Sequence, residues 1–168
     1  TDDGLRYEAV WRFDRKILGG FSDLENHPVL EKLSQILDNS IPEQAELEIS
    51  FETHRGRIFF NPWITQRIIQ VLPNLKLTAD FSHWCVVCEG LQETETDIIH
   101  SLLTNVGHIH GRVGYDQGPQ VPDPRGLLYQ ADMEKHCEWW HWIWAEHYRQ
   151  GKNITTVTPE FGYDGYEY

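Results

Sequence analysis

The stretch "VGHIHGRVGYDQGPQVPDP", residues 106–124, begins as a short apolar run and continues as a loop rich in Gly and Pro. The apolar run predicts a strand over residues 106–113. His108 and His110 are two residues apart, so their side chains face the same side of that strand. The segments before and after the strand indicate what these two imidazoles meet.

Three other segments are also predicted to be short strands: "LEISFE" (residues 47–52), "LKLTADF" (75–81) and "NITTVTPE" (153–160). Helical patterns lie between them. "NPWITQRIIQVL" has Pro in its first turn, and "TDIIHSLL" offers Thr96 or Asp97 as an N-cap. Alternating strands and helices are typical of parallel βαβ units with right-handed crossovers, so the predicted fold class is α/β.

The third helical pattern, "DMEKHCEWWHWIWAEHYRQG" (residues 132–151), has Asp132 as a candidate cap and Gly151 as a stop. We expect it to be a packing helix. His136, His141 and His147 are expected to titrate at its surface. The stripe predicted to face the core consists of Met133, Cys137, Trp140, Trp144 and Tyr148.

Each predicted strand carries an unusual polar residue at or near its C-terminal end. In a barrel of parallel strands these ends converge on one mouth, where such enzymes place their chemistry. Carboxylates gathered there repel one another unless a cation lies between them. Three oxygen donors and one imidazole suit Mn²⁺, Mg²⁺, Co²⁺ or Zn²⁺. The alternative is that the acidic residues only cap the helices that follow. The residues concerned are Glu52, Asp80, His108 with His110, and Glu160.

The motifs "ISFETHRGR", "LTADFSHWCVVCE", "GHIHGRVGYDQGPQVPDPR" and "TPEFG" resemble, in the same order, the second half of the sugar phosphate isomerase/epimerase family of xylose isomerase-like TIM barrels. The resemblance implies a partial (β/α)8 TIM-type barrel of about four parallel βα units, the C-terminal half, over residues 46–168. Residues 1–45 do not match the family. They contain one amphipathic helix in "HPVLEKLSQILDN" and a strand or short helix around residues 9–18.

The resemblance also implies residue roles. The family's metal ligands correspond to Glu52, Asp80, His110 and Glu160, and the histidine of its D-x-x-H motif, which faces the substrate, corresponds to His83. The implied reaction is isomerisation or epimerisation of a sugar or sugar phosphate, in which a divalent metal polarises the substrate oxygens. Glu52 and Glu160 are then the catalytic acid and base, one removing a proton beside the carbonyl and the other returning it.

Other polar residues near the strand ends have two interpretations each. Arg112 either binds a substrate group or neutralises the acidic mouth, and His54 with Arg55 either contact substrate or lie in a solvated loop. His108 is expected to be a core imidazole or to hold a carboxylate in place. The loop "GYDQGPQVPDPRG" (residues 114–126) is either a rim over the mouth or a stiff connector.

A complete barrel needs about 250 residues, so isomerase activity is expected only if the barrel is completed. The alternative is a non-catalytic metal-binding half-barrel or assembly subunit, including a homo-oligomer that rebuilds a barrel. A half-barrel is expected to leave two open edges and an apolar inner face. A cupin is disfavoured because no Glu follows the H-x-H pair at the required spacing, and a metal-dependent nuclease because the chain lacks a basic stripe.

Composition limits the partners and the location. The formal net charge of −12 disfavours nucleic acid, so a small-molecule sugar or sugar phosphate is expected. No apolar run reaches the ~20 residues of a membrane span, and "TDDGLRYEAV" does not have the pattern of a signal peptide, which predicts a cytoplasmic protein. Three cysteines make no disulfide framework, and "CVVC" lacks the second pair of a zinc site, so two buried thiols are expected there.

Overall fold

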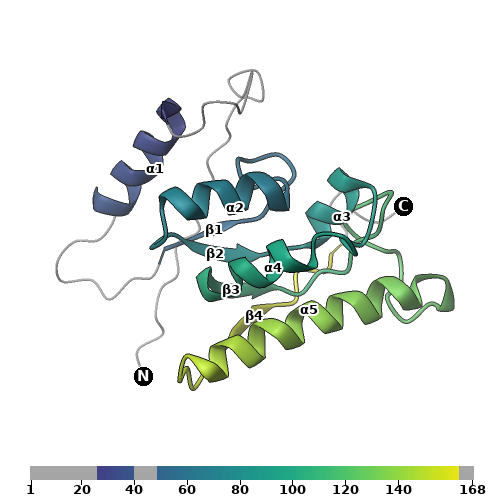
Figure 1. Ribbon diagram of the computed structural model, residues 1–168. Coiled ribbons are helices and arrows are strands. Elements are labelled where there is room, and N and C mark those ends of the chain that lie inside the picture. The colour runs from purple at the N-terminus through teal and green to yellow at the C-terminus, as the bar shows by residue number, and fades with distance from the viewer. Residues whose placement is uncertain (1–25, 40–48, 163–168) are drawn as a thin grey trace.

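The computed structural model describes residues 26–39 and 49–162. Strands and helices alternate along the described chain, which confirms the α/β class (Figure 1). In chain order, the elements are α1 (Pro28–Asn39), β1 (Ser50–Glu52), α2 (Pro62–Val71), β2 (Lys76–Ala79), α3 (Ser82–Cys88), α4 (Thr96–Leu102), η3 (Leu103–Asn105), β3 (Val106–His110), η4 (Leu127–Tyr129), α5 (Gln130–Arg149) and β4 (Thr156–Thr158).

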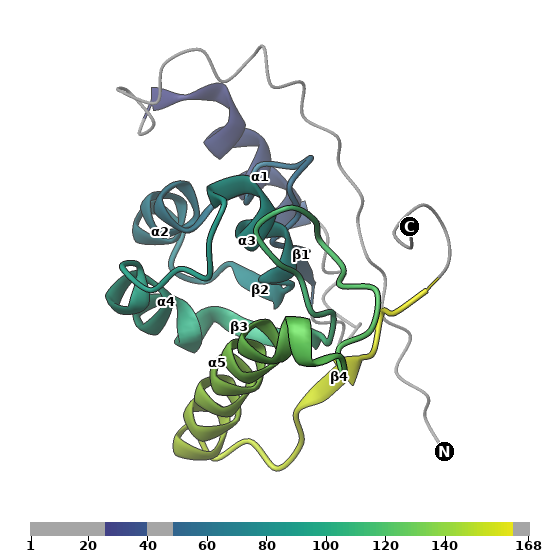
Figure 2. The same cartoon turned by 90° about the vertical axis from the view of Figure 1, so that its right-hand side faces the viewer.

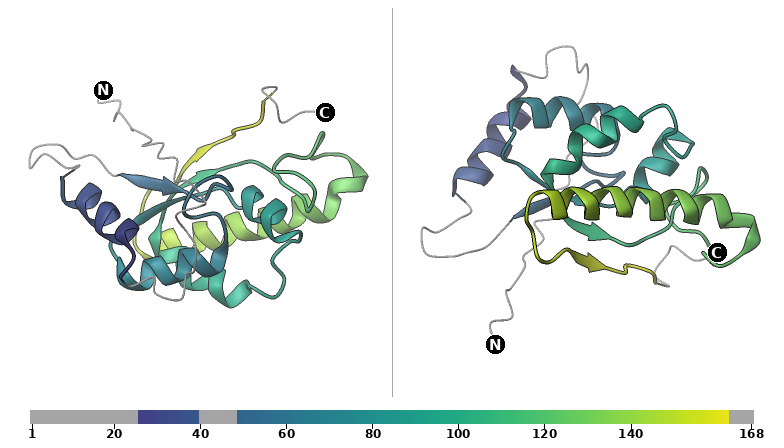
Figure 3. Two further views of the ribbon diagram at one scale, coloured as in Figure 1. Left: turned by 90° about the horizontal axis from the view of Figure 1, so that it is seen from above. Right: turned by 60° about the horizontal axis from the view of Figure 1, so that its bottom comes forward.

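The four strands form one parallel sheet in the order β1-β2-β3-β4, so each strand pairs with the next one along the chain. In the register, Glu52 lies opposite Thr78, Thr78 opposite His108, and His108 opposite Thr156. Helices α2, α4 and α5 lie on one face of the sheet (Figures 2 and 3). Because all four strands are parallel, their C-terminal ends lie at the same end of the sheet.

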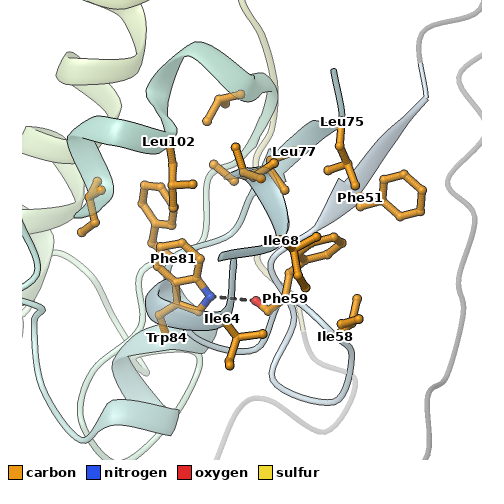
Figure 4. Packing of buried hydrophobic residues seen from close by; sticks show 14 of the residues in the cluster. Phe51, Ile58, Phe59, Ile64, Ile68, Leu75, Leu77, Phe81, Trp84 and Leu102 are labelled. Atoms are coloured by element: carbon orange, nitrogen blue, oxygen red, sulfur yellow. Dashed lines mark hydrogen bonds between the residues drawn. The ribbon is translucent and has the colours of Figure 1, made fainter. Parts of the chain in front are cut away.

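The core lies between the sheet and these helices. Phe51 on β1 and Leu77 on β2 are buried with side chains from α2 and α4 (Figure 4), and Ile109 on β3 belongs to the same buried cluster. Burial of each such side chain stabilises the fold by about 1.5–3 kcal/mol. Trp84 of α3 is fully buried, and its indole Nε1 donates a hydrogen bond of 2.8 Å to the carbonyl oxygen of Phe59. This bond fixes α3 against the loop that follows β1.

The opposite face of the sheet is polar. Ser50 Oγ and Thr78 Oγ1 are 2.6 Å apart, and the ring nitrogens of His108 lie 2.7 Å from Thr156 Oγ1 and 2.9 Å from Thr158 Oγ1. The expectation of an apolar inner face is therefore wrong for these strands. Hydroxyl and imidazole groups, bonded across the strands, occupy this face instead of apolar side chains.

Helix α5 begins earlier than its sequence pattern suggested. Tyr129 is the N-cap and Asp132 lies in the first turn, so the predicted Asp132 cap is wrong. Gly151, with φ +74°, follows the C-cap Gln150, which confirms the predicted stop. A left-handed conformation of this kind favours glycine because it has no Cβ.

The predicted core stripe of α5 is wrong in large part, because Cys137, Trp144 and Tyr148 are exposed and only Trp140 of the predicted tryptophans packs against the core. The buried side chains are His136, Trp139, Ile143 and His147, whereas Trp144 is 45% exposed and Tyr148 is 85% exposed. The two histidines can be buried because their ring nitrogens have partners. His136 Nδ1 donates to its own helix at Asp132 O and Nε2 accepts from Gly114 N, whereas His147 Nε2 donates to Val106 O and Nδ1 accepts from Thr155 Oγ1. His141 is exposed, as expected.

The remaining helices agree with the sequence in part. Asn61 caps α2 by accepting a 2.9 Å bond from Ile64 N, with Pro62 in the first turn. Helix α4 begins at Thr96 after Glu95 and has no side-chain cap, so neither Thr96 nor Asp97 is its N-cap. Helix α3 was not predicted. Of the two thiols expected to be buried, Cys85 is buried and Cys88 is half-buried, and both are free.

The N-terminal part of the chain contains helix α1, which confirms the amphipathic pattern of residues 27–39. The element expected around residues 9–18 and the boundary between residues 45 and 46 lie outside the described residues. In the described part of the chain, no helix is both long enough and apolar enough to cross a membrane.

Candidate metal centre

Four side chains meet at the C-terminal ends of the strands. Glu52 is the last residue of β1, Asp80 follows β2, His110 is the last residue of β3, and Glu160 lies two residues beyond β4. Each offers one ligand atom, and these atoms all lie within 4.8 Å of one another. The structure therefore brings together the four residues predicted as ligands.

Asp80 has one satisfied carboxylate oxygen and one that lacks a hydrogen bond. Its Oδ1 accepts from the Ser82 amide at 3.2 Å and from the Ser82 hydroxyl. Its Oδ2 is buried without a hydrogen-bond partner, 3.9 Å from His110 Nδ1 and 3.4 Å from Arg112 Nε. A buried oxygen in this state is costly, and a cation held by the four side chains would compensate for it.

Strong charge coupling joins the cluster. Burial alone lowers the pKa of His110, but its contacts with Glu160 Oε2 at 2.5 Å and Glu52 Oε1 at 3.3 Å raise it to about 10. Burial raises the pKa of Glu160, but His110 and Arg112 outweigh burial and lower it to about 2. Burial raises the pKa of Asp80 to about 8 although Arg112 opposes the shift. The protonation of each group therefore depends on the charge of its neighbours.

Two arginines contact the carboxylates. Arg112 is buried, and its Nη2 lies 2.8 Å from Glu160 Oε1. Its contacts are therefore those expected if Arg112 neutralises the acidic side chains rather than binds a substrate group. Arg57 forms an ion pair with Glu52 Oε2. Sequence reasoning missed Arg57. The signal was its position in "ETHRGR", but only the fold of the loop shows that this arginine, rather than Arg55, returns to Glu52.

His83 and His54 lie beside the cluster. His83 is fully buried, neither of its ring nitrogens has a hydrogen-bond partner, and its Nε2 is 3.6 Å from Asp80 Oδ2. The His54 ring packs on it with the centroids 4.0 Å apart, and His54 Nδ1 accepts a 3.0 Å bond from Gly56 N. Burial lowers the pKa of both imidazoles. Together with Glu52 they form a second group whose ligand atoms lie within 4.8 Å of one another.

The hydrogen bonds of His108 described above join it to threonine hydroxyls rather than to the carboxylates. Its ring lies 5.5 Å from that of His110, centroid to centroid, and is perpendicular to it. The two imidazoles therefore share a face of the sheet, as expected, but Thr156 and Thr158 hold His108. His110 therefore belongs to the charged cluster, and His108 belongs to the polar face of the sheet.

The loop after β3 folds back on itself. Val121 N donates to Val113 O at 2.8 Å, and Gln120 Nε2 donates to Gly162 O at 3.2 Å, two residues beyond Glu160. A Cβ at Gly114 would lie 2.6 Å from Ser82 O, so glycine is needed for this close approach. The loop therefore lies against both the start of α3 and the segment that carries Glu160.

No family model matches this chain, and neither a curated protein nor a solved structure is matched by it. The geometry of the side chains at the strand ends is therefore the basis on which a function can be assigned.

Proposed function

We propose that this chain is a divalent-metal-dependent isomerase or epimerase acting on a sugar or sugar phosphate, built on four βα units of a (β/α)8 barrel. The observation that carries the proposal is the convergence of Glu52, Asp80, His110 and Glu160, one from the end of each successive strand. Sequential strand order with the crossover helices on one face supports a segment of barrel wall over a doubly wound sheet.

The donor set fits a divalent ion. Three carboxylates and one imidazole suit Mn²⁺, Mg²⁺, Co²⁺ or Zn²⁺, and the buried Asp80 Oδ2 lacks a hydrogen bond. When bound, the ion supplies polarisation of the substrate carbonyl and hydroxyl oxygens. The four side chains named above would hold it.

The protein's own groups move the proton. Glu52 and Glu160 come from the two outer strands, β1 and β4, so they can approach a bound molecule from two sides. One carboxylate takes the proton from the carbon beside the carbonyl, and the other returns a proton. His83 offers ring nitrogens to a substrate hydroxyl, and Arg112 orients Glu160 through its ion pair.

We expect a small-molecule substrate rather than a nucleic acid, because the formal net charge is −12. A second candidate is a half-barrel without turnover, acting as a metal-binding or assembly subunit. The observation that favours it is the four-stranded sheet, in which β1 and β4 each pair with one strand among the described residues. Pairing of two copies through these edges would build a larger barrel.

Proton exchange distinguishes the two candidates. Purified chain loaded with Mn²⁺ would be incubated with a panel of sugars in deuterated water, and deuterium incorporation measured by NMR. The isomerase proposal expects incorporation beside the carbonyl, at least about 100-fold slower in Glu160→Gln, because a general base contributes about 10²–10⁴-fold. Glu134→Gln, an exposed change on α5, is the control. Stoichiometric Mn²⁺ with no exchange in any sugar would favour the non-catalytic subunit.

A further inference from the structure

Glu160 is the one member of the four-residue charged cluster whose backbone has a positive φ, +35°. A residue other than glycine keeps such a conformation only where neighbouring contacts hold it, because its Cβ lies too close to the backbone. Rotation about φ at this residue changes the direction of its Cα–Cβ bond relative to β4. The strained turn therefore determines whether the carboxylate reaches the cluster.

The segment that carries this turn is held weakly by its other contacts. β4 pairs with one strand, β3, among the described residues, and Val157 and Phe161 are exposed, so apolar burial contributes little there. The Glu160 carboxylate contacts His110 and Arg112, but 32% of this side chain is exposed, and water weakens ion pairs. These contacts alone do not account for a strained turn.

The side chain of Gln120 supplies a further restraint. Gln120 lies in the loop after β3, is only 3% exposed, and uses both ends of its amide. Its Nε2 donates to Gly162 O at 3.2 Å, and its Oε1 accepts from Gly162 N at 3.4 Å. Two bonds to one residue fix both the position and the orientation of the backbone two residues after Glu160.

The loop that carries Gln120 is itself attached to the body of the fold. Val121 is fully buried, and its N donates to Val113 O at 2.8 Å. Gly114 N donates to His136 Nε2 on α5 at 3.2 Å. Gln120 therefore connects the segment after β4 to a loop that is anchored on α5 (Figure 2).

We propose that Gln120 is a positioning residue that holds Glu160 in its strained turn and so keeps the carboxylate in the metal centre, a role that rests on the proposed function. Gln120 acts through the backbone of Gly162. Without its two bonds, the turn relaxes toward a negative φ, and the carboxylate leaves the position in which it serves as ligand and as acid or base.

Two measurements on Gln120→Met test this role. Met is similar to Gln in size but makes neither amide bond. Calorimetry should show Mn²⁺ binding weakened by about tenfold, the smaller effect typical of residues that orient metal ligands. NMR of the metal-free chain measures the one-bond Cα–Hα coupling of Glu160, which distinguishes a positive from a negative φ. We expect a positive φ in wild type and a negative φ in the variant.

Gln92→Met is the matched control. Gln92 is also 3% exposed, and its Nε2 donates to backbone carbonyls of α3 and the turn after it, at Trp84 and Gly90. This substitution should lower stability but change Mn²⁺ affinity by less than about twofold. Gln120→Asn keeps an amide that is one carbon too short for both bonds, so it should change both readouts in the same direction as Gln120→Met, and it replaces that variant if circular dichroism shows an unfolded chain.

A folded Gln120 variant with wild-type Mn²⁺ affinity, or one in which Glu160 keeps a positive φ, would overturn the inference and leave the metal site standing. Equal weakening in Gln92→Met would also overturn it, because the effect would then follow from general loss of packing. A wild-type chain that binds no Mn²⁺ overturns the proposed function, whereas the φ of Glu160 then still shows whether Gln120 holds the turn.

Discussion

The molecule buries two kinds of histidine. On α5, His136 and His147 have a hydrogen-bond partner at each ring nitrogen. At the strand ends, His83 is equally buried but has none, and His110 lies among three carboxylates. Residue type and burial are alike, so the partners make the difference. Imidazoles bonded to backbone and threonine groups serve the fold, whereas an imidazole without a partner, or one among carboxylates, remains able to bind a ligand.

The cost of burial supports this division. A buried polar group without a partner costs about 1–3 kcal/mol, whereas a satisfied one costs little. The fold therefore carries a penalty at His83 and at Asp80 Oδ2 that it avoids at His136 and His147. Buried polar groups that lack a hydrogen bond, together with shifted pKa values, are typical of functional sites.

The largest expected effect is on metal affinity. In His110→Ala one of the four proposed ligands is lost, so affinity for Mn²⁺ should fall by more than about 100-fold. Calorimetry with wild type in parallel measures the change, and circular dichroism checks the fold. Unaltered Mn²⁺ affinity would show that His110 belongs with the structural histidines.

A strong pH dependence should accompany binding. Contacts with Glu160 and Glu52 raise the pKa of His110 to about 10, above its unfolded value of about 6.5. The proton thus stabilises the metal-free chain fully below about pH 6.5, and this stabilisation is lost as pH rises through about 10. The ion must displace this proton and also the proton that Asp80, with a pKa of about 8, holds below that pH. Mn²⁺ affinity should therefore rise by about tenfold to about 100-fold per pH unit between pH 6 and 8. An affinity independent of pH would contradict the shift.

Substitution of a buried α5 histidine should lower the stability of the fold and leave metal affinity nearly unchanged. His147→Ala removes a buried ring that bonds to Thr155 Oγ1 and to Val106 O, although Val106 O keeps a 3.3 Å bond from Lys152 Nζ. The cavity and the lost bonds together should lower the free energy of unfolding by about 3 kcal/mol. Urea denaturation measures this fall, and Mn²⁺ affinity in the folded variant should stay within about twofold of wild type. Weaker Mn²⁺ binding with unchanged stability would remove the distinction between the two regions.

The smallest effect is expected at His141, on the same helix but exposed. His141→Ala removes no buried contact, so the free energy of unfolding should change by less than about 0.5 kcal/mol. The same urea measurement provides the value. A loss as large as that of His147→Ala would mean that the buried hydrogen bonds of His147 do not account for the difference between the two positions.

The sequence located the strand ends but not the face of α5. Glu52, Asp80 and His110 stand out because each ends an apolar run, and the parallel βα alternation places such ends together. Helix α5 has Trp, His and apolar residues on two stripes, and the choice between them depends on partners such as Gly114 N and Val106 O. These belong to distant segments, so local periodicity cannot select the stripe.

Short or irregular segments were predicted least well. Helix α3 has only seven residues and contains two adjacent valines, a pattern that favours a strand. Arg57 lies in a loop whose course depends on hydrogen bonds to His54. Neither feature leaves a periodic signal, so both appear only in the folded chain.

Each of the four strands supplies one member of the charged cluster, and the members span residues 52 to 160. A chain in which only two or three strands have paired therefore has an incomplete cluster. Contacts between segments so distant in sequence form slowly, because long loops must close first. The cluster should assemble at the last stage of folding, and an ion bound there would lengthen the lifetime of the native state with little effect on the rate at which the chain folds.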